Sequence, residues 1–421
     1  MIQTTPISPG VVLRCCRDDR FKQGCLSFQF LRQMDEGEAH LNALLPSVML
    51  RATVPHPDLR AITRHLDDLY GSSIGPLVRR LGDRQTTGFF CSFLDDRFAM
   101  AGDRVTAGMM AFLEEVLTQP LLEGEEFLED IVESEKRNLI STIESELNDK
   151  GAYAMGRLLK NMCRGDAFGL PRLGEKEAVA RITPRELYDH YCRIRRESPV
   201  EVFYVGSMEP SAIAEMLRPM LESWDRCPLT LPPQTGLNAG QGSQETEAMD
   251  VSQGKLCLGF LTPITNRSRD YAAMVVMNNI FGAGMTSKLF MNVREKLSLC
   301  YSIGASYYGS KGLMAVSAGI DFCKEAETRQ EIFNQLEACR RGEITAQELN
   351  AAKEAIRSGI RSAHDSPGAI EGYYSTTAIS EAAMTPEMYL SAVENVTVED
   401  VAKAAQAVTY HSSYFLKGAE A

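Results

Sequence analysis

The sequence has 421 residues, 44% of them hydrophobic and 24% charged, with a formal net charge of −12 at pH 7. A chain of this length exceeds one ordinary hydrophobic core and predicts about two to four globular domains. The acidic balance disfavours nucleic acid as a partner, because phosphate binding needs clustered cations, and no run approaches the roughly eighteen apolar residues of a membrane span.

The N-terminal segment reaches charged residues at Arg14 and Arg17 before any apolar stretch long enough for a signal peptide. We therefore expect no signal peptide and a cytoplasmic location. The eleven cysteines are odd in number and contain no C-x-x-C spacing, although Cys15 and Cys16 are adjacent. This pattern favours reduced, mostly buried thiols over a disulfide framework or a structural zinc site.

Helices and strands are predicted to cluster rather than to alternate strictly. In the first half, the patterns predict strands at residues 24–30, 87–94 and 200–205, and helices at about residues 38–52, 57–70, 103–118, 124–148, 152–163 and 183–194. In the second half, strands are predicted at residues 255–261, 302–308 and 312–319. This grouping indicates the α+β class, with mainly antiparallel sheets packed against helices.

Similar patterns recur at about half the chain length. Residues 182–187 resemble 396–401, and in each copy a threonine, Thr183 or Thr397, is predicted to cap a helix. The β-rich runs that end at Gly206 and Gly418 also correspond, as do the helices at 125–140 and 346–360. An internal duplication is favoured over coincidence among short helical patterns. A segment rich in Pro, Gly, Gln and Thr divides the chain into predicted domains 1–228 and 249–421, joined by a linker at 229–248.

The six histidines and the glycine-rich segment 282–288 match no chemical motif. No histidine stands in H-x-x-x-H, H-x-x-E-H or H-E-x-x-H spacing. His65 can pair with Asp68 three residues later on one helix, but its charged context favours a solvated side chain over a metal ligand. His56, between two prolines, is interpreted as a turn residue. The segment 282–288 lacks the G-x-x-x-x-G-K-[ST] pattern, so its glycines are interpreted as structural.

The most informative segment is residues 281–308, where Arg294 and Tyr301 stand at a predicted junction of helix and strand. From the residues alone, Arg294 can be a surface cation in the cluster Arg294-Glu295-Lys296, and Tyr301 a half-buried residue at a strand edge. The alternative is a pair of hydrogen-bonding groups at a functional site.

The whole chain resembles the insulinase/pitrilysin superfamily, specifically the small bacterial subunits that are similar to mitochondrial processing peptidase. The resemblance is carried most specifically by Asn279, Gly282, Gly284, Ser287, Leu289, Phe290, Arg294, Glu295, Lys296 and Tyr301. It implies two homologous α+β domains, and pairs of subunits that enclose an unfolded peptide. In active members, the arginine and tyrosine of this segment hydrogen-bond to the peptide backbone near the scissile carbonyl, where a phenol can donate to a developing oxyanion.

Active members also carry an inverted zinc motif, H-x-x-E-H, and a third glutamate ligand further along the chain. Aligned on residues 49–53, this sequence has Ala43 and Ser47 in place of the histidines and Pro46 in place of the catalytic glutamate. Counted from Glu135, the later glutamate is replaced by Thr142. None of these side chains can bind zinc or act as its base, so we expect no metal site and no cofactor in this chain.

The resemblance therefore implies a catalytically silent subunit of a heterodimeric zinc peptidase. A homologous subunit bearing H-x-x-E-H would hold the zinc, and this chain would supply Arg294 and Tyr301 for binding an unfolded peptide or leader segment. No nucleic acid and no membrane are expected as partners. Two alternatives stay open: a purely structural homologue, like core subunits of some respiratory complexes, and a stand-alone peptide-binding homodimer.

Overall fold

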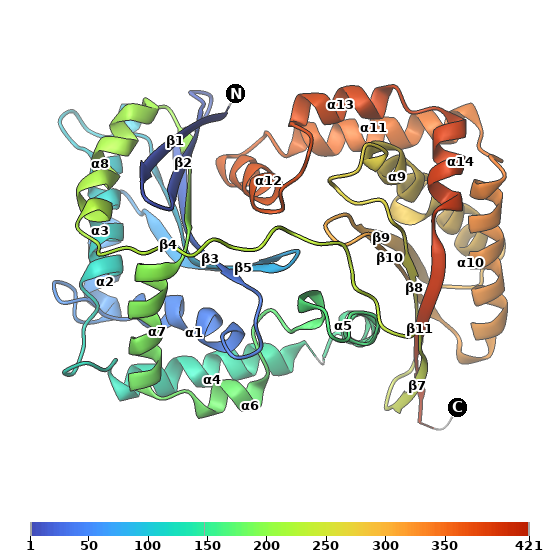
Figure 1. The fold of residues 1–421 in the computed structure, drawn as a ribbon, viewed down its shortest axis with the longest axis horizontal. Coiled ribbons are helices and arrows are strands. Elements are labelled where there is room, and N and C mark those ends of the chain that lie inside the picture. The colour runs from blue at the N-terminus through green and yellow to red at the C-terminus, as the bar shows by residue number, and fades with distance from the viewer. Residues whose placement is uncertain (1, 147, 420–421) are drawn as a thin grey trace. The chain divides into compact units, whose positions relative to one another are not determined.

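The computed structural model describes residues 2–146 and 148–419. Their contacts separate the chain into two compact units. Unit 1 contains the chain up to Glu144, then Leu170–Pro233 and Ala363–Thr376; unit 2 contains Ser145–Gly169, Gln234–Ser362 and the chain from Thr377 onwards. Each unit is a sheet covered by helices, which confirms the α+β class (Figure 1).

The sheet of unit 1 has six strands. Their bounds are β1 Ile2–Ser8, β2 Val11–Arg17, β3 Gln23–Gln33, β4 Ser73–Leu81, β5 Arg84–Leu94 and β6 Val200–Gly206, and their order in the sheet is β1-β2-β6-β3-β5-β4. Only β2 and β6 pair in parallel. The three strands predicted in this half correspond to β3, β5 and β6. Apolar and polar residues alternate less clearly along β1, β2 and β4.

The sheet of unit 2 repeats this plan with five strands. Their bounds are β7 Gln244–Met249, β8 Gly254–Leu261, β9 Ser302–Tyr308, β10 Leu313–Ile320 and β11 Thr409–Gly418, in the order β7-β11-β8-β10-β9. Here β7 and β11 form the parallel pair, and the other neighbours are antiparallel. The five strands of unit 2 thus have the same order and the same parallel and antiparallel pairing as strands β2-β6-β3-β5-β4 of unit 1. This agreement confirms the internal duplication.

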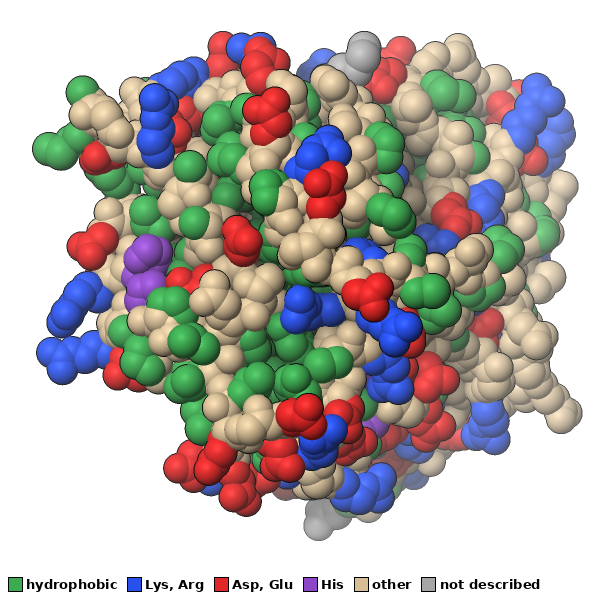
Figure 2. Space-filling model, turned by 60° about the vertical axis from the view of Figure 1, so that its left-hand side comes forward, with side chains coloured by type: hydrophobic (Ala, Val, Ile, Leu, Met, Phe, Trp, Pro, Cys, Tyr) green, Lys and Arg blue, Asp and Glu red, His purple; other side chains and the backbone are tan. Residues whose placement is uncertain are grey.

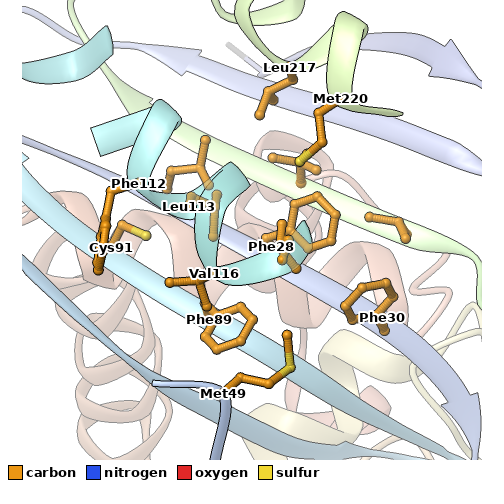
Figure 3. Close-up of a cluster of buried hydrophobic side chains, with 14 of the residues drawn as sticks. Phe28, Phe30, Met49, Phe89, Cys91, Phe112, Leu113, Val116, Leu217 and Met220 are labelled. Carbon is orange, nitrogen blue, oxygen red and sulfur yellow. The ribbon is translucent and has the colours of Figure 1, made fainter. Parts of the chain in front are cut away.

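The main core of unit 1 lies between one face of its sheet and a layer of helices. The helices of this unit are α1 Ala39–Met49, α2 Leu59–Asp68, α3 Val105–Thr118, α4 Glu129–Ser145, α6 Lys176–Arg181, α7 Pro184–Glu197 and α8 Pro210–Glu222. Figure 3 shows Phe28 and Phe89 of the sheet packed with Phe112 and Leu113 of α3, and Met220 of α8 beside them. Because side chains alternate along a strand, Phe28 faces this core while Ser27 and Gln29 face the opposite side.

The helix predicted at 124–148 begins later, at Glu129. The preceding residues form a turn instead, in which Gly124 has a φ of 65° and Leu122 pairs with Phe127 in a short antiparallel bridge. Glycine adopts this left-handed conformation without steric cost, so the acidic residues before α4 belong to a turn.

The opposite face of the unit 1 sheet is covered by a segment from near the C-terminus. It belongs to α12, Pro367–Ile379, of which the part up to Thr376 lies in unit 1. The buried Glu371 carboxylate accepts hydrogen bonds from Ser27 Oγ at 2.6 Å and Gln29 Nε2 at 3.1 Å. Arg79 donates to both carboxylate oxygens, at 3.0 and 2.8 Å, and to Ser375 Oγ at 2.8 Å. An ion pair between the buried Glu371 and the partly exposed Arg79 therefore fixes this segment to the sheet.

In unit 2, helical segments cover one face of the sheet. They are α9 Tyr271–Asn278, η3 Asn279–Ala283, η4 Leu289–Lys296, α10 Glu325–Arg340, α11 Ala346–Ser362, α13 Pro386–Glu394 and α14 Val398–Gln406. The predicted caps form: Thr397 and Asp400 make a reciprocal capping box at α14, and Thr183 Oγ1 accepts from the Glu186 N–H at α7.

The other face of the unit 2 sheet is covered by α5, Lys150–Met162, which comes from the first half of the chain. Its Leu158 and Met162 pack against Cys257 and Tyr414 of the sheet. A Cβ atom on Gly259 would lie 2.0 Å from Met162 Sδ, so a larger residue would require Met162 to shift.

A second ion pair secures the end of this segment. Lys311 is 0% exposed, and its Nζ lies 2.9 Å from Asp166 Oδ1. The Asp166 carboxylate also accepts from the backbone N–H groups of Phe168 at 2.8 Å and Asn238 at 3.1 Å. The ion pair therefore connects the turn after α5 to the turn between β9 and β10.

These two segments make the units discontinuous. The sequence predicts contiguous domains at 1–228 and 249–421, but residues 145–169 belong to unit 2 and residues 363–376 to unit 1. Strand β7, Gln244–Met249, also occupies the end of the predicted linker at 229–248. The periodic pattern of a helix identifies its apolar side but not the sheet on which that side packs.

Most of the cysteines are buried, and the surface carries side chains of both charges. No helix within residues 2–146 and 148–419 is both long and apolar enough to cross a membrane. On the face shown in Figure 2, basic and acidic side chains are interspersed. All eleven cysteines lie in described parts of the chain and carry free thiols, and those exposed are Cys192, Cys227 and Cys323.

Candidate functional site

The helix that aligns with the zinc motif is α1, and its side chains are those of a packing helix. Ala43 and Pro46 are buried, and Ser47 is half-buried. Because proline has no N–H, Pro46 cannot donate the usual helical hydrogen bond to the Asn42 carbonyl. Thr87 Oγ1 of β5 donates to that carbonyl at 2.6 Å instead. The fold therefore accommodates the proline that aligns with the catalytic base.

A buried polar network lies beside Ala43. Asn42 donates from Nδ2 to Gln85 Oε1 at 2.8 Å, and its Oδ1 lies 2.8 Å from His190 Nε2. Arg193 Nη2 is 2.9 Å from His190 Nδ1. Since a guanidinium can only donate, Nδ1 accepts and Nε2 carries the proton given to Asn42. Burial, and secondarily the charge of Arg193, lower the pKa of His190 to about 3, so the imidazole is neutral and structural.

The fourth aligned position, Thr142 on α4, is exposed, and its hydroxyl donates to the Asn138 carbonyl at 2.9 Å. It supplies no carboxylate. Within residues 2–146 and 148–419, no group of three or more His, Cys, Asp or Glu side chains is arranged to hold a metal ion. The aligned positions therefore have neither the ligands nor the general base of an H-x-x-E-H site.

Two histidines that sequence patterns treat separately do meet in unit 1. The rings of His56 and His65 have centroids 4.5 Å apart, and His56 Nδ1 lies 2.7 Å from Glu115 Oε1. His65 also packs on Phe112, at 5.0 Å between ring centroids, so it is not a fully solvated side chain. Burial, together with His56, lowers the pKa of His65. These contacts hold the turn after α1 against α2 and α3.

Arg294 and Tyr301 lie together at one pocket of unit 2, with a volume of about 410 Å³. Arg294 extends from η4, a π-helical segment, with its guanidinium 4.6 Å from the centre of the Phe290 ring and 3.7 Å from Glu295 Oε1. Its side chain is 39% exposed. Tyr301 precedes β9 and is 59% exposed, with its N–H bonded to the Gly319 carbonyl at 2.8 Å. Arg294 and Tyr301 thus both line this pocket.

The phenol of Tyr301 donates its hydrogen bond to Asp321 Oδ1 at 2.8 Å. This bond raises the pKa of Tyr301, because loss of the phenolic proton would place an anion beside the carboxylate. Asp321 follows β10 directly and had no signal in the sequence analysis. Lys324, three residues later, donates from Nζ to the Ser298 carbonyl at 2.8 Å and lies 4.0 Å from Asp321 Oδ2.

The turn between Arg294 and Tyr301 forms the rest of the pocket. Ser298 has a φ of 49°, and Leu299 and Cys300 are buried. Burial raises the pKa of Cys300 to about 11, although Arg294 and Lys324 oppose this effect. The thiol is therefore protonated near neutral pH and is not an activated nucleophile. The residues that line the pocket present hydrogen-bonding groups, and Cys300 supplies no activated nucleophile among them.

The chain is similar in sequence to proteins described as inactive peptidases. A family model described as "Peptidase M16 inactive domain" matches residues 181–356. "Probable inactive metalloprotease YmfF" of Bacillus subtilis (strain 168) is 30% identical over 414 residues, covering 98% of this chain and 96% of that protein.

Two solved structures extend this similarity to the fold. A conserved protein from Enterococcus faecalis V583 has a TM-score of 0.90 at 26% identity, covering 99% of this chain and 98% of the other. A peptidase M16 inactive domain from Pseudomonas fluorescens has a TM-score of 0.80 at 18% identity, again covering 99% and 98%. These similarities confirm the resemblance to the insulinase/pitrilysin superfamily. The chain belongs to the peptidase M16 family as an inactive member.

Proposed function

We propose that this chain is the substrate-binding subunit of a heterodimeric zinc peptidase. Its partner is a homologous subunit that carries H-x-x-E-H and holds the zinc, and the pair cleaves unfolded peptides or leader segments in the cytoplasm. The observation that carries this proposal is the contrast within one chain. The residues of α1 that align with the zinc motif are packing residues, whereas Arg294 and Tyr301 are exposed at a pocket.

The chemistry of Arg294 supports binding to a peptide backbone. A guanidinium presents five N–H donors in a fixed plane and cannot lose its charge near neutral pH. Stacking on Phe290 at 4.6 Å restrains this plane while leaving part of the side chain exposed. A donor held in this way can bond to a peptide carbonyl with little loss of side-chain entropy.

Exposed apolar side chains in the segment that carries Arg294 also suit an extended peptide. Met285 is 76% exposed, and Met291 and Leu297 of the same segment are also exposed. Methionine adapts to apolar side chains of different shapes. Tyr301 leads directly into β9, which is an edge strand of the unit 2 sheet. An edge strand can pair with an added peptide strand, so β9 offers a backbone surface next to Arg294.

Arg294→Ala tests this proposal in the assembled pair. We expect kcat/KM for an unstructured peptide to fall about 10- to 100-fold, because a charge-assisted hydrogen bond to the substrate is lost. Cleavage is measured with a quenched fluorescent peptide library, and size-exclusion chromatography verifies that the pair still assembles. Arg341→Ala is the matched control, since Arg341 is an exposed arginine of the same unit that pairs with Glu343.

Equal activity of the Arg294→Ala and wild-type pairs would contradict a role in substrate binding and favour a purely structural subunit. A stable homodimer of this chain that binds peptide but never associates with a zinc-bearing homologue would favour the stand-alone peptide-binding alternative.

A further inference from the structure

We propose that the outer edge of β7 is a binding site for an unfolded peptide segment that carries basic residues. The segment adds to the sheet of unit 2 as one more antiparallel strand, in the position that β1 occupies in unit 1. Strands β7 and β9 are opposite edges of this sheet, so the site is separate from the pocket at Arg294 and Tyr301. Binding here requires neither zinc nor a partner subunit.

The internal duplication shows where a further strand fits. In each unit one strand pairs in parallel with the last strand of that unit, β2 with β6 and β7 with β11. The other side of β2 pairs antiparallel with β1, and α8 packs against β1 in turn. Within residues 2–146 and 148–419, no strand pairs with the other side of β7. The sheet of unit 2 therefore ends at β7, beside β11, where the sheet of unit 1 continues by one strand (Figure 1).

The backbone of β7 presents free hydrogen-bonding groups along this edge. The Met249 carbonyl accepts from the Ala419 N–H at 3.0 Å, so the odd-numbered residues of β7 direct their backbone groups toward β11. Because these groups alternate along a strand, those of Gln244, Thr246 and Ala248 point away from the sheet. All three residues are exposed, and no group in the described part of the chain bonds to their outward N–H and C=O. Such an edge can pair with an added strand.

Strand β7 also lacks two features that commonly prevent pairing at an edge, a proline and a bulge. The edge strand β1 of unit 1 has both, since it contains Pro6 and its register with β2 shifts between Pro6 and Ser8. The register of β7 with β11 is continuous over Gln244–Met249, and this segment contains no proline. The edge of β7 is therefore regular enough to align a second backbone along its length.

Two carboxylates determine the charge of the segment that can bind. Glu245 and Glu247 lie on the side of the sheet covered by α5, and their side chains are 34% and 31% exposed. Arg157 of α5 lies 3.7 Å from each carboxylate, so the group keeps an excess of negative charge. Tyr153 donates to Glu247 at 3.1 Å, which holds this carboxylate at the strand. Opposite charges on neighbouring strands stabilise pairing, so lysine or arginine fits beside these carboxylates.

The same carboxylates disfavour a second copy of this chain as the occupant. In a full antiparallel overlap of two β7 strands, Glu245 of one copy lies opposite Glu247 of the other. Like charges directly opposite each other on paired strands are destabilising. The edge therefore selects an extended basic segment of another polypeptide over self-association.

Peptide probes test the site with the full chain alone. The probe is a dye-labelled peptide of about nine residues in which arginine alternates with threonine. When its arginines lie opposite the two carboxylates, the N–H groups of its threonines face β7, because opposite residues of antiparallel strands share their orientation. The first control replaces arginine by glutamate. A matched pair of controls carries N-methyl groups either on the threonines, which blocks pairing with β7, or on the arginines, which does not.

We expect the arginine probe to bind about 10-fold more tightly than the glutamate peptide or the peptide methylated at threonine. Fluorescence anisotropy measures the affinities. Hydrogen exchange with mass spectrometry locates the bound segment, and exchange should slow at residues 244–249. Absence of binding by the arginine probe at about 1 mM, or slowed exchange only outside this segment, would overturn the site. Equal affinity for the arginine and glutamate peptides would overturn the assignment of a basic ligand.

Thr246→Pro provides an independent test from the side of the protein. It removes one outward N–H from β7, and proline is tolerated on an edge strand where the N–H faces solvent. We expect it to weaken binding of the arginine probe about 10-fold, whereas Thr246→Val, which keeps the N–H, should leave affinity unchanged. Urea unfolding verifies that both variants fold, and the methylated peptides decide the question if Thr246→Pro does not. A concentration-dependent dimer that Thr246→Pro abolishes would assign the edge to a second copy and overturn the proposal.

Discussion

Asp166→Ala is expected to lower the free energy of unfolding of unit 2 by about 3–5 kcal/mol. Lys311 is 0% exposed, and its Nζ is 2.9 Å from Asp166 Oδ1. Removing the carboxylate takes the Asp166 ion pair away from a lysine charge in a buried site. The substitution also removes the acceptor for the Phe168 and Asn238 N–H groups. Equilibrium unfolding in urea, followed by circular dichroism, measures the loss.

The double variant Asp166→Ala with Lys311→Met tests whether the buried lysine charge causes this loss of stability. Replacing a buried ion pair by apolar side chains is often close to neutral, so the double variant should regain more than half of the lost stability. The stability of Asp166→Asn should lie between those of the wild type and Asp166→Ala, because an amide oxygen can still accept from the two backbone N–H groups. A loss below about 1 kcal/mol in Asp166→Ala would show that the pair does not anchor the segment after α5.

Glu371→Ala is expected to cost unit 1 about 2–3 kcal/mol and to expose α12 to proteases. The carboxylate accepts from Ser27, Gln29 and Arg79, all on one face of the sheet. Arg79 is 27% exposed, so water can solvate part of its charge when Glu371 is lost, and the cost is below that for Asp166. Urea unfolding gives the free energy, and limited proteolysis with mass spectrometry locates the first cleavage.

Glu387→Ala is the control for this prediction, because Glu387 is an exposed glutamate on the first turn of α13. It should change stability by less than about 0.5 kcal/mol and leave the proteolysis pattern unchanged. Cleavage that begins in another segment of Glu371→Ala, with α12 intact, would contradict an anchoring role for Glu371.

Local patterns in the sequence predict most of the strands and helices. The apolar run at 200–205 and the alternation at 302–308 fall within β6 and β9, because the pattern of burial along a strand is set by its own residues. The assignment of α5 and α12 to units could not be predicted in this way. It depends on contacts between distant residues, such as Met162 on Gly259 and Glu371 on Arg79, which no local pattern encodes.

At the candidate site, too, local sequence predicts some of the contacts, and others depend on residues that are distant in sequence. Arg294 and Tyr301 are close in sequence, and their placement at one pocket follows from the short turn between η4 and β9. Asp321 is distant in sequence and reaches Tyr301 through the pairing of β9 with β10, in which Ser302 lies opposite Gly319. Both strands were predicted, so the missing information was their register, which depends on the turn that joins them.

The most direct test of the proposed role is to compare the purified chain alone with the chain mixed with a homologous subunit that carries H-x-x-E-H. Zinc content is measured by mass spectrometry after dialysis, and cleavage with a library of quenched unstructured peptides. We expect the chain alone to contain no stoichiometric zinc and to cleave no peptide, since its aligned positions are Ala43, Pro46, Ser47 and Thr142. Mixing with the homologue should produce zinc-dependent cleavage that neither subunit shows alone. A homogeneous, zinc-loaded and proteolytically active preparation of this chain would contradict the account.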